Sequence, residues 1–137
     1  MKPLEILGLD VGKSHTGIAR GNMLAKIAEP LSTVKTDEVF GTLDKMIDQL
    51  GINTVVVGLP RSLDGRDTEQ TVWTRQWAAK AKHKLGIPIY WQDEALTTKK
   101  AISHQPSANS SIDEHALAAV AILQDFLDSP ENMRVSV

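Results

Sequence analysis

The sequence predicts an α/β fold, with a mixed five-stranded sheet of three antiparallel strands and then a βαβα arrangement, flanked by helices. Residues 4–9 and 54–58 are short, predominantly apolar runs, as expected for strands buried in a sheet. Residues 36–50, 68–85 and 112–127 instead repeat apolar residues at spacings of three and four, as amphipathic helices do. Strands that alternate with helices in this way form a sheet covered by helices.

The first apolar run, residues 4–9, ends at Asp10 and is followed by a tight connection and a returning strand at residues 16–20. A third strand is expected over residues 27–34, where Pro30 indicates an edge or a bulge. Asp10 has two interpretations. It is a carboxylate held at a strand end, where it can bind a metal, or it starts an Asp-x-Gly turn.

The rest of the chain alternates between the two patterns, and Gly51 and Gly86 stop two of the helices. A loop with an Asp64-Gly65 turn precedes the longest helix. Residues 1–128 are expected to form one domain and residues 129–137 a flexible tail. The predicted helices are 36–50, 68–85, 96–103 and 112–127, and the predicted later strands are 54–58 and 87–92.

Two tryptophans, Trp73 and Trp77, lie four residues apart in the helix predicted over 68–85. Either ring could stack on a nucleic-acid base. The helical spacing continues through Ala81 and Leu85, however, and favours packing of both rings in the core.

Composition limits the function classes. The 137-residue chain has no cysteine, which excludes disulfides and thiolate metal sites. It shows neither a signal peptide nor an apolar run long enough for a membrane span, so a cytoplasmic protein without a membrane partner is expected. The net charge of −2 argues against a polyanion binder held by charge alone. Six basic against three acidic residues in 61–84 give +3, and one arginine against five acids in 113–137 gives −4.

Carboxylates recur at the predicted element ends. Asp10 follows the first strand, Asp93 and Glu94 follow the last, and Asp113 falls in the first turn of the helix predicted over 112–127. Strand ends meet in such sheets, and clustered carboxylates suit hard cations such as Mg²⁺ or Mn²⁺. The spacing alone leaves two questions open: whether Asp93 or Glu94 belongs to the cluster, and whether Asp113 is only a helix cap.

The motifs, taken together and in order, resemble the YqgF family, also called RuvX, of Holliday-junction resolvases and pre-16S ribosomal RNA nucleases with a ribonuclease-H-like fold. The four matching stretches span nearly the whole chain. They are Leu7-Gly-Leu-Asp-Val-Gly12 with Gly17-Ile18-Ala19, Val57-Gly-Leu-Pro60 with Asp64-Gly65, Asp93-Glu94 with Leu96-Thr97-Thr98, and Asp113 with Ala118-Ala119 and Ile122-Leu123-Gln124.

The resemblance implies a nuclease whose catalytic and metal-binding residues are Asp10, Glu94 and Asp113, with Mg²⁺ or Mn²⁺ as the cofactor. It favours Glu94 over Asp93. The implied substrate is precursor ribosomal RNA or branched DNA, and the implied assembly is a monomer or a homodimer. Two alternative functions remain open: a catalytically silent RNA-binding module, and a nucleotide-phosphate-binding module of the actin and sugar-kinase type.

Substrate contacts are expected from Lys13, His15, Arg61 and Arg66, which stand in loops beside the predicted strand ends. The chain departs from the family pattern at His15-Thr16, at Ala95, where an arginine is common, and in a short segment before Asp113 that has few basic residues. These changes leave the carboxylates intact. They concern the grip on the substrate, because phosphate contacts come largely from Lys, Arg and backbone N–H groups.

Overall fold

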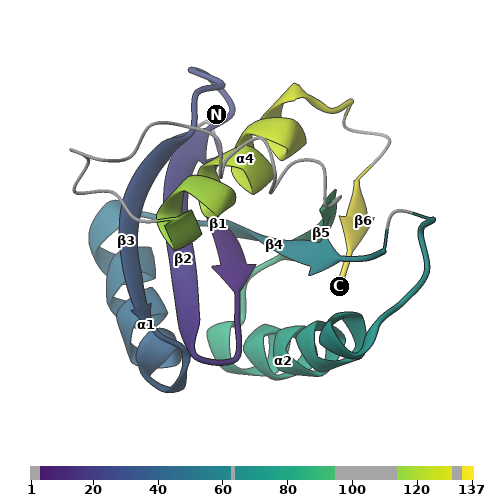
Figure 1. Cartoon of the computed structure of the whole chain (residues 1–137). Coiled ribbons are helices and arrows are strands. Elements are labelled where there is room, and N and C mark those ends of the chain that lie inside the picture. The colour runs from purple at the N-terminus through teal and green to yellow at the C-terminus, as the bar shows by residue number, and fades with distance from the viewer. Residues whose placement is uncertain (1–3, 63, 95–113, 131–133) are drawn as a thin grey trace.

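A mixed sheet with helices on both faces forms the molecule (Figure 1). The structure is a computed structural model that describes residues 4–62, 64–94, 114–130 and 134–137. Helices α1 (Val39–Leu50) and α2 (Glu69–Leu85) lie on one face of the sheet, and α4 (Glu114–Asp128) crosses the other. A 3₁₀ turn, η1 (Thr36–Glu38), leads into α1.

The sheet has the strand order β3-β2-β1-β4-β5-β6. The first three strands are antiparallel, and β4 and β5 run parallel to β1. The bounds are β1 Glu5–Val11, β2 His15–Asn22, β3 Glu29–Lys35, β4 Thr54–Pro60, β5 Ile89–Glu94 and β6 Val135–Ser136. The α/β class and the five predicted strands are confirmed.

Strand β6 is the main difference from expectation. It lies in residues 129–137, expected to be a flexible tail, and makes the sheet six-stranded by pairing antiparallel with Tyr90 and Trp91 of β5. The backbone N–H of Val137 also donates to the carbonyl of Ile89. A strand of two residues is too short to show the alternation of apolar and polar residues that predicts strands. Strand β6 is therefore recognised only from its pairing with β5.

The predicted helices 36–50, 68–85 and 112–127 correspond to η1 with α1, to α2 and to α4. Helices α1 and α2 end at Gly51 and Gly86, both in the left-handed region at φ 68°. At the start of α2, Thr68 and Thr71 cap each other's backbone N–H groups. The helix expected over 96–103 lies outside the described residues.

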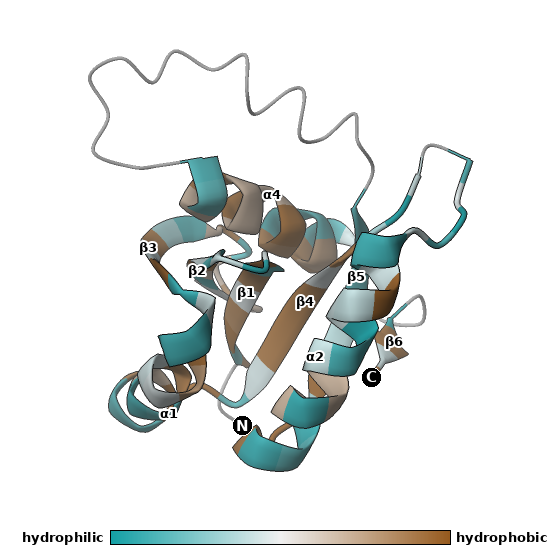
Figure 2. Cartoon of the chain, turned by 60° about the horizontal axis from the view of Figure 1, so that its bottom comes forward, coloured by the Kyte–Doolittle hydropathy of each residue, from teal (hydrophilic) through white to brown (hydrophobic). Residues whose placement is uncertain are grey.

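Two cores form because successive side chains of a strand point to opposite faces. Leu9 and Val57 face α1 and α2 in a core that also contains Trp77. Val56 faces α4 in the second core. The apolar colouring of β1 and β4 in Figure 2 reflects burial on both faces. Trp77 is only 6% exposed and Trp73 packs against the same core, which confirms core packing for both rings.

Candidate active site at the ends of β1, β4 and β5

Asp10 lies on the face of β1 that α4 covers. A Cβ at Gly8 would stand 2.6 Å from Cβ of Leu123 in α4, and Asp10, two residues further along the strand, shares that face. Asp10 pairs with Gly17 of β2 and is followed by one more strand residue. It is therefore held inside a central strand, which fixes its backbone more firmly than the strand end or turn expected from the sequence.

The first turn of α4 touches the sheet beside Asp10. A Cβ at Gly17, the partner of Asp10, would lie 1.9 Å from the backbone oxygen of His115. Only glycine allows the helix to come this close. The absence of a side chain at position 17 therefore brings the start of α4 against Asp10.

Glu94 lies on the same face, at the end of β5. Its side chain reaches over β4, because Oε2 stands 3.1 Å from where a Cβ at Gly58 would be. Gly58 belongs to the strand between β1 and β5, one residue beyond the pair Leu9–Val57 that aligns β1 with β4. The Glu94 carboxylate is thereby directed toward Asp10, and the residue is only 6% exposed.

Asp93 has a different environment. As the neighbour of Glu94 on β5, it points to the opposite face of the sheet. Its side chain is 70% exposed, and Oδ1 lies 3.6 Å from Nε of Arg61. Of the two acidic residues at this strand end, the structure places Glu94 on the face of Asp10 and Asp93 on the face of α2.

The arrangement of Asp10 and Glu94 fits a hard divalent cation. Adjacent strands are about 5 Å apart, so a carboxylate above Gly58 lies within one strand spacing of Asp10. Carboxylate oxygens are the donors that Mg²⁺ prefers, and glycine at position 58 leaves the space above β4 open. Within the described part of the chain no three metal-ligating side chains gather. Asp113, the third expected ligand, lies outside that part, one residue before α4 begins at Glu114.

Two histidines border the site on the side of β2. The ring of His15 stacks on that of His115, with centroids 5.8 Å apart and planes at 22°. Lys13 is exposed in the turn between β1 and β2. Sequence reasoning selected Lys13 and His15 but missed His115, whose only sequence signal is its place two residues after Asp113.

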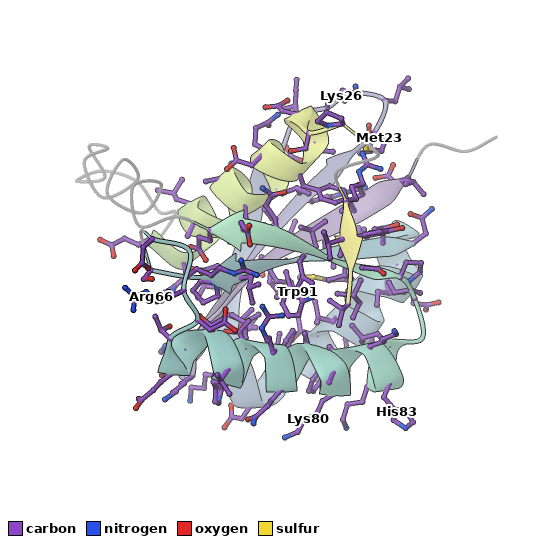
Figure 3. The ribbon with its side chains drawn as sticks, turned by 90° about the vertical axis from the view of Figure 1, so that its right-hand side faces the viewer. Met23, Lys26, Arg66, Lys80, His83 and Trp91 are labelled. Carbon is purple, nitrogen blue, oxygen red and sulfur yellow. The ribbon has the colours of Figure 1, made fainter. Side chains whose placement is uncertain are left out.

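The loop after β4 holds the two expected arginines in different ways. Arg66 is 84% exposed along its side chain, and its Nε donates to Asp64 at 2.6 Å. Hydrogen bonds from Ser62 and then Arg66 lower the pKa of the Asp64 carboxyl. Arg61 instead faces Asp67 and Asp93, with Nε 3.8 Å and 3.6 Å from their carboxylates. Arg66 extends outward from the loop (Figure 3). Arg61 turns toward the face of α2, where Asp67 and Asp93 lie.

A comparison with known families matches residues 4–129 of the chain to the family described as RuvX, Holliday junction resolvase. The chain belongs to the RuvX family.

Curated relatives extend the match over almost the full length. A protein of Lactococcus lactis subsp. cremoris named "Putative pre-16S rRNA nuclease" is 34% identical over 90% of this chain and 94% of its own. A Rickettsia rickettsii protein of the same name is 34% identical over 93% of this chain and 88% of its own. The RuvX assignment agrees with the resemblance carried by the motifs.

Solved structures support the ribonuclease-H-like fold. RuvC of T. thermophilus in complex with a Holliday junction substrate superposes with a TM-score of 0.63 at 15% identity, over 98% of this chain and 99% of that chain. At this identity the similarity concerns the fold alone. Among the described residues of this RuvX-family chain, no helix is long and apolar enough to cross a membrane.

Proposed function

We propose that this chain is a metal-dependent nuclease that hydrolyses phosphodiester bonds in structured nucleic acid, and that its substrate is the 5′ end of pre-16S ribosomal RNA. The observation that carries the proposal is the placement of Asp10 and Glu94 on one face of the sheet, on either side of Gly58. The names of the curated relatives support the choice of RNA.

The proposed site consists of Asp10, Glu94 and Asp113. Two divalent cations would be held by these carboxylates: Asp10, which sits on a central strand, would serve both, and Glu94 and Asp113 would each serve one. Bound Mg²⁺ or Mn²⁺ would polarise the phosphate and lower the pKa of an attacking water. Burial of Glu94 and the place of Asp10 within a central strand hold these two carboxylates in position before substrate arrives.

Substrate contacts are proposed at both ends of the site. Lys13 and His15 lie beside Asp10, and Arg66 offers an exposed guanidinium after β4. Arg61 also follows β4, and it contacts Asp93 of β5 on the face of α2. With so few cations, binding should be weak and should fall steeply with salt.

A divalent-metal requirement and a cytoplasmic location are parts of the same proposal, since precursor ribosomal RNA is processed where ribosomes are made. A monomer suffices for RNA. Symmetric cutting of a DNA junction requires two copies, so junction cleavage would come with a homodimer.

The decisive experiment incubates the protein with a pre-16S 5′ extension or a four-way DNA junction, each with Mg²⁺, Mn²⁺ or EDTA. We expect metal-dependent cleavage of the RNA. Asp10→Asn, Glu94→Gln and Asp113→Asn should each reduce cleavage by orders of magnitude while binding largely survives, because a charged ligand is lost with little change of shape. Asp93→Asn is the matched control: its side chain points away from Asp10, so the variant should keep most of the cleavage rate even if the contact with Arg61 weakens. Equal loss in Asp93→Asn and Glu94→Gln would contradict the proposed site.

Asp113 needs a second variant because asparagine caps a helix almost as well as aspartate. If Asp113 binds metal, Asp113→Ala should abolish cleavage without a lower melting temperature in EDTA. If it is only a cap, the variant should lose about 1 kcal/mol of stability and still cleave.

The second candidate function is Holliday-junction resolution, which the family description and the RuvC-like fold favour. Selective cleavage of the four-way junction over the RNA would establish it. Metal-independent RNA binding without any cleavage would instead indicate a silent binding module, and a thermal shift with ATP and Mg²⁺ would indicate a nucleotide-phosphate-binding module.

A further inference from the structure

A cavity of about 600 Å³ opens at the outer edge of β5, next to the proposed site but separate from its carboxylates. Its lining includes three arginines and one tryptophan. Among the lining residues are Leu59, Arg61, Arg75, Trp91, Asp93 and Arg134.

The cavity exists because β6 is short. It pairs with β5 only at Tyr90 and Trp91, so from Gln92 onward the outer edge of β5 carries no further strand among the described residues. In the view of Figure 3, Trp91 occupies the space between this edge and α2. Leu59 on β4 also lines the cavity.

Positive charge converges on the cavity from three separate parts of the chain. Arg61 follows β4, Arg75 belongs to α2, and Arg134 precedes β6. Nε of Arg61 donates no hydrogen bond to any described residue and is held by Asp67 and Asp93 at ion-pair distance only.

The other two arginines are positioned by aromatic rings. The Arg75 guanidinium lies 5.8 Å from the centre of the Trp91 ring, and its Nε is 3.3 Å from Asp67. Arg134 lies 4.5 Å from the centre of the Phe126 ring. Cations held over aromatic rings keep their outer N–H groups directed at a ligand, and planar guanidinium groups suit phosphate oxygens.

We propose that this cavity binds one unpaired nucleotide of the substrate strand, with the arginines contacting its phosphate and the Trp91–Arg75 pair offering a stacking surface to its base. The volume lies in the range of small-ligand pockets, roughly 300–1,000 Å³, and is too small to admit a duplex. Stacking on aromatic rings and guanidinium planes is the usual way in which proteins hold unpaired bases.

The position of the cavity connects it with the proposed nuclease site, on which this inference rests. Asp93 and Glu94 are consecutive on β5, and they face the cavity and the catalytic carboxylates respectively. A strand cut beside Glu94 can therefore pass over the edge of β5, which no further strand of the described residues covers beyond Trp91, into the cavity. The preferred substrate is then one with a single-stranded flank next to the cleaved bond.

The test measures binding of a fluorescein-labelled single-stranded RNA and of a blunt RNA duplex by anisotropy in EDTA, where no cleavage occurs. Arg75→Gln and Arg134→Gln should each weaken single-strand binding roughly tenfold, since each removes a charge-assisted phosphate contact. The slope of log K against log salt should fall by about 0.7 for each arginine. Single-stranded RNA should also quench a tryptophan signal that Trp91→Phe removes.

Lys80→Gln is the matched control, because Lys80 lies on the same helix as Arg75 and points away from the sheet (Figure 3). It removes one charge and should change binding less than twofold. Arg134 also donates to Sδ of Met23 at 3.3 Å. The RNA affinity of Arg134→Gln is therefore compared with that of the wild type only when the two melting temperatures agree. If Arg134→Gln melts at a lower temperature, the test rests on Arg75→Gln alone, because the Arg75 side chain is 41% exposed and its replacement leaves the core intact.

Three results would overturn the inference: equal binding by Arg75→Gln and Lys80→Gln, an equal loss for the blunt duplex, or quenching by AMP at the same affinity as by the RNA. The last would assign the cavity to a free nucleotide. The cleavage assay separates these failures from that of the nuclease proposal. If the protein cleaves in the presence of metal and Arg75→Gln binds RNA normally, only the proposal for the cavity is wrong. If binding depends on the arginines but no cleavage occurs, only the nuclease proposal is wrong.

Discussion

Gly58 offers a direct test of the site, because it occupies the strand between Asp10 and Glu94. In Gly58→Ala the new Cβ would stand 2.4 Å from Cδ1 of Ile122 and 3.1 Å from Oε2 of Glu94. Ile122 is 2% exposed and belongs to the core under α4. The substitution therefore overpacks that core and displaces the Glu94 carboxylate.

The two contacts have different expected magnitudes. Overpacking a core costs about 1–3 kcal/mol, which corresponds to a fall in melting temperature of roughly 4–12 °C for a domain of this size. The contact with Glu94 requires a shift of only part of an ångström. Misplacement of a catalytic group by about 1 Å can cost roughly 100-fold in rate, so we expect cleavage to fall about tenfold or more.

A double variant separates stability from activity. Ile122→Val removes Cδ1, the nearest of the three atoms that the new Cβ would meet, and leaves a γ-carbon like Cγ1, which stands at 3.0 Å, so Gly58→Ala/Ile122→Val should recover part of the melting temperature. Its cleavage rate should stay low, because the contact with Glu94 remains. The assay is RNA cleavage with Mn²⁺ at 20 °C, beside melting curves in EDTA. Gly41→Ala is the control, since a Cβ at Gly41 of α1 meets nothing within 4 Å and should stabilise the helix by roughly 0.5–1 kcal/mol.

The reasoning would be refuted if the double variant cleaved as fast as Ile122→Val alone while folded. Cleavage would then not depend on the space that Gly58 leaves for the Glu94 carboxylate, and the metal site would have to be placed elsewhere.

Other expected outcomes follow from the same geometry. Mn²⁺ should raise the melting temperature of the wild-type chain more than that of a variant lacking one of the three proposed carboxylates, and those variants should melt at an unchanged or higher temperature in EDTA, because crowded carboxylates repel. The double variant Arg61→Ala/Arg66→Ala should weaken RNA binding more than Lys80→Ala/Lys82→Ala, as measured by anisotropy at several salt concentrations. An equal loss of affinity would show that the loop after β4 does not contact the substrate. Partial desolvation, and then repulsion by Asp128, raise the pKa of Asp125 above its value of 3.8 in the unfolded chain. The charged form of Asp125 therefore destabilises the fold once the pH exceeds that unfolded value. Asp125→Asn should therefore raise the melting temperature slightly at pH 7 and not near pH 3, and an equal rise at both values would contradict this cause.

Much of the fold was determined by the sequence alone. The run at residues 54–58 contains three consecutive valines and no charged residue, as expected for a strand covered on both faces, and the structure buries it in this way. Helical spacing placed Trp73 and Trp77 in the core, and Gly51 and Gly86 marked two helix ends. These features are local, because the period of apolar residues and the backbone freedom of glycine act within a few residues of the chain.

The arrangement of the site was decided only by the tertiary structure. Residues 87–94 show no clean alternation, so the sequence could not tell which of Asp93 and Glu94 shares a face with Asp10. Gly17 and Gly58 look like ordinary strand glycines until α4 crosses them and Glu94 reaches over β4. Strand β6 exists because β5 offers an unpaired edge. Each of these features depends on contact between segments far apart in the chain, and such contacts are fixed by packing against a shared sheet rather than by any local pattern.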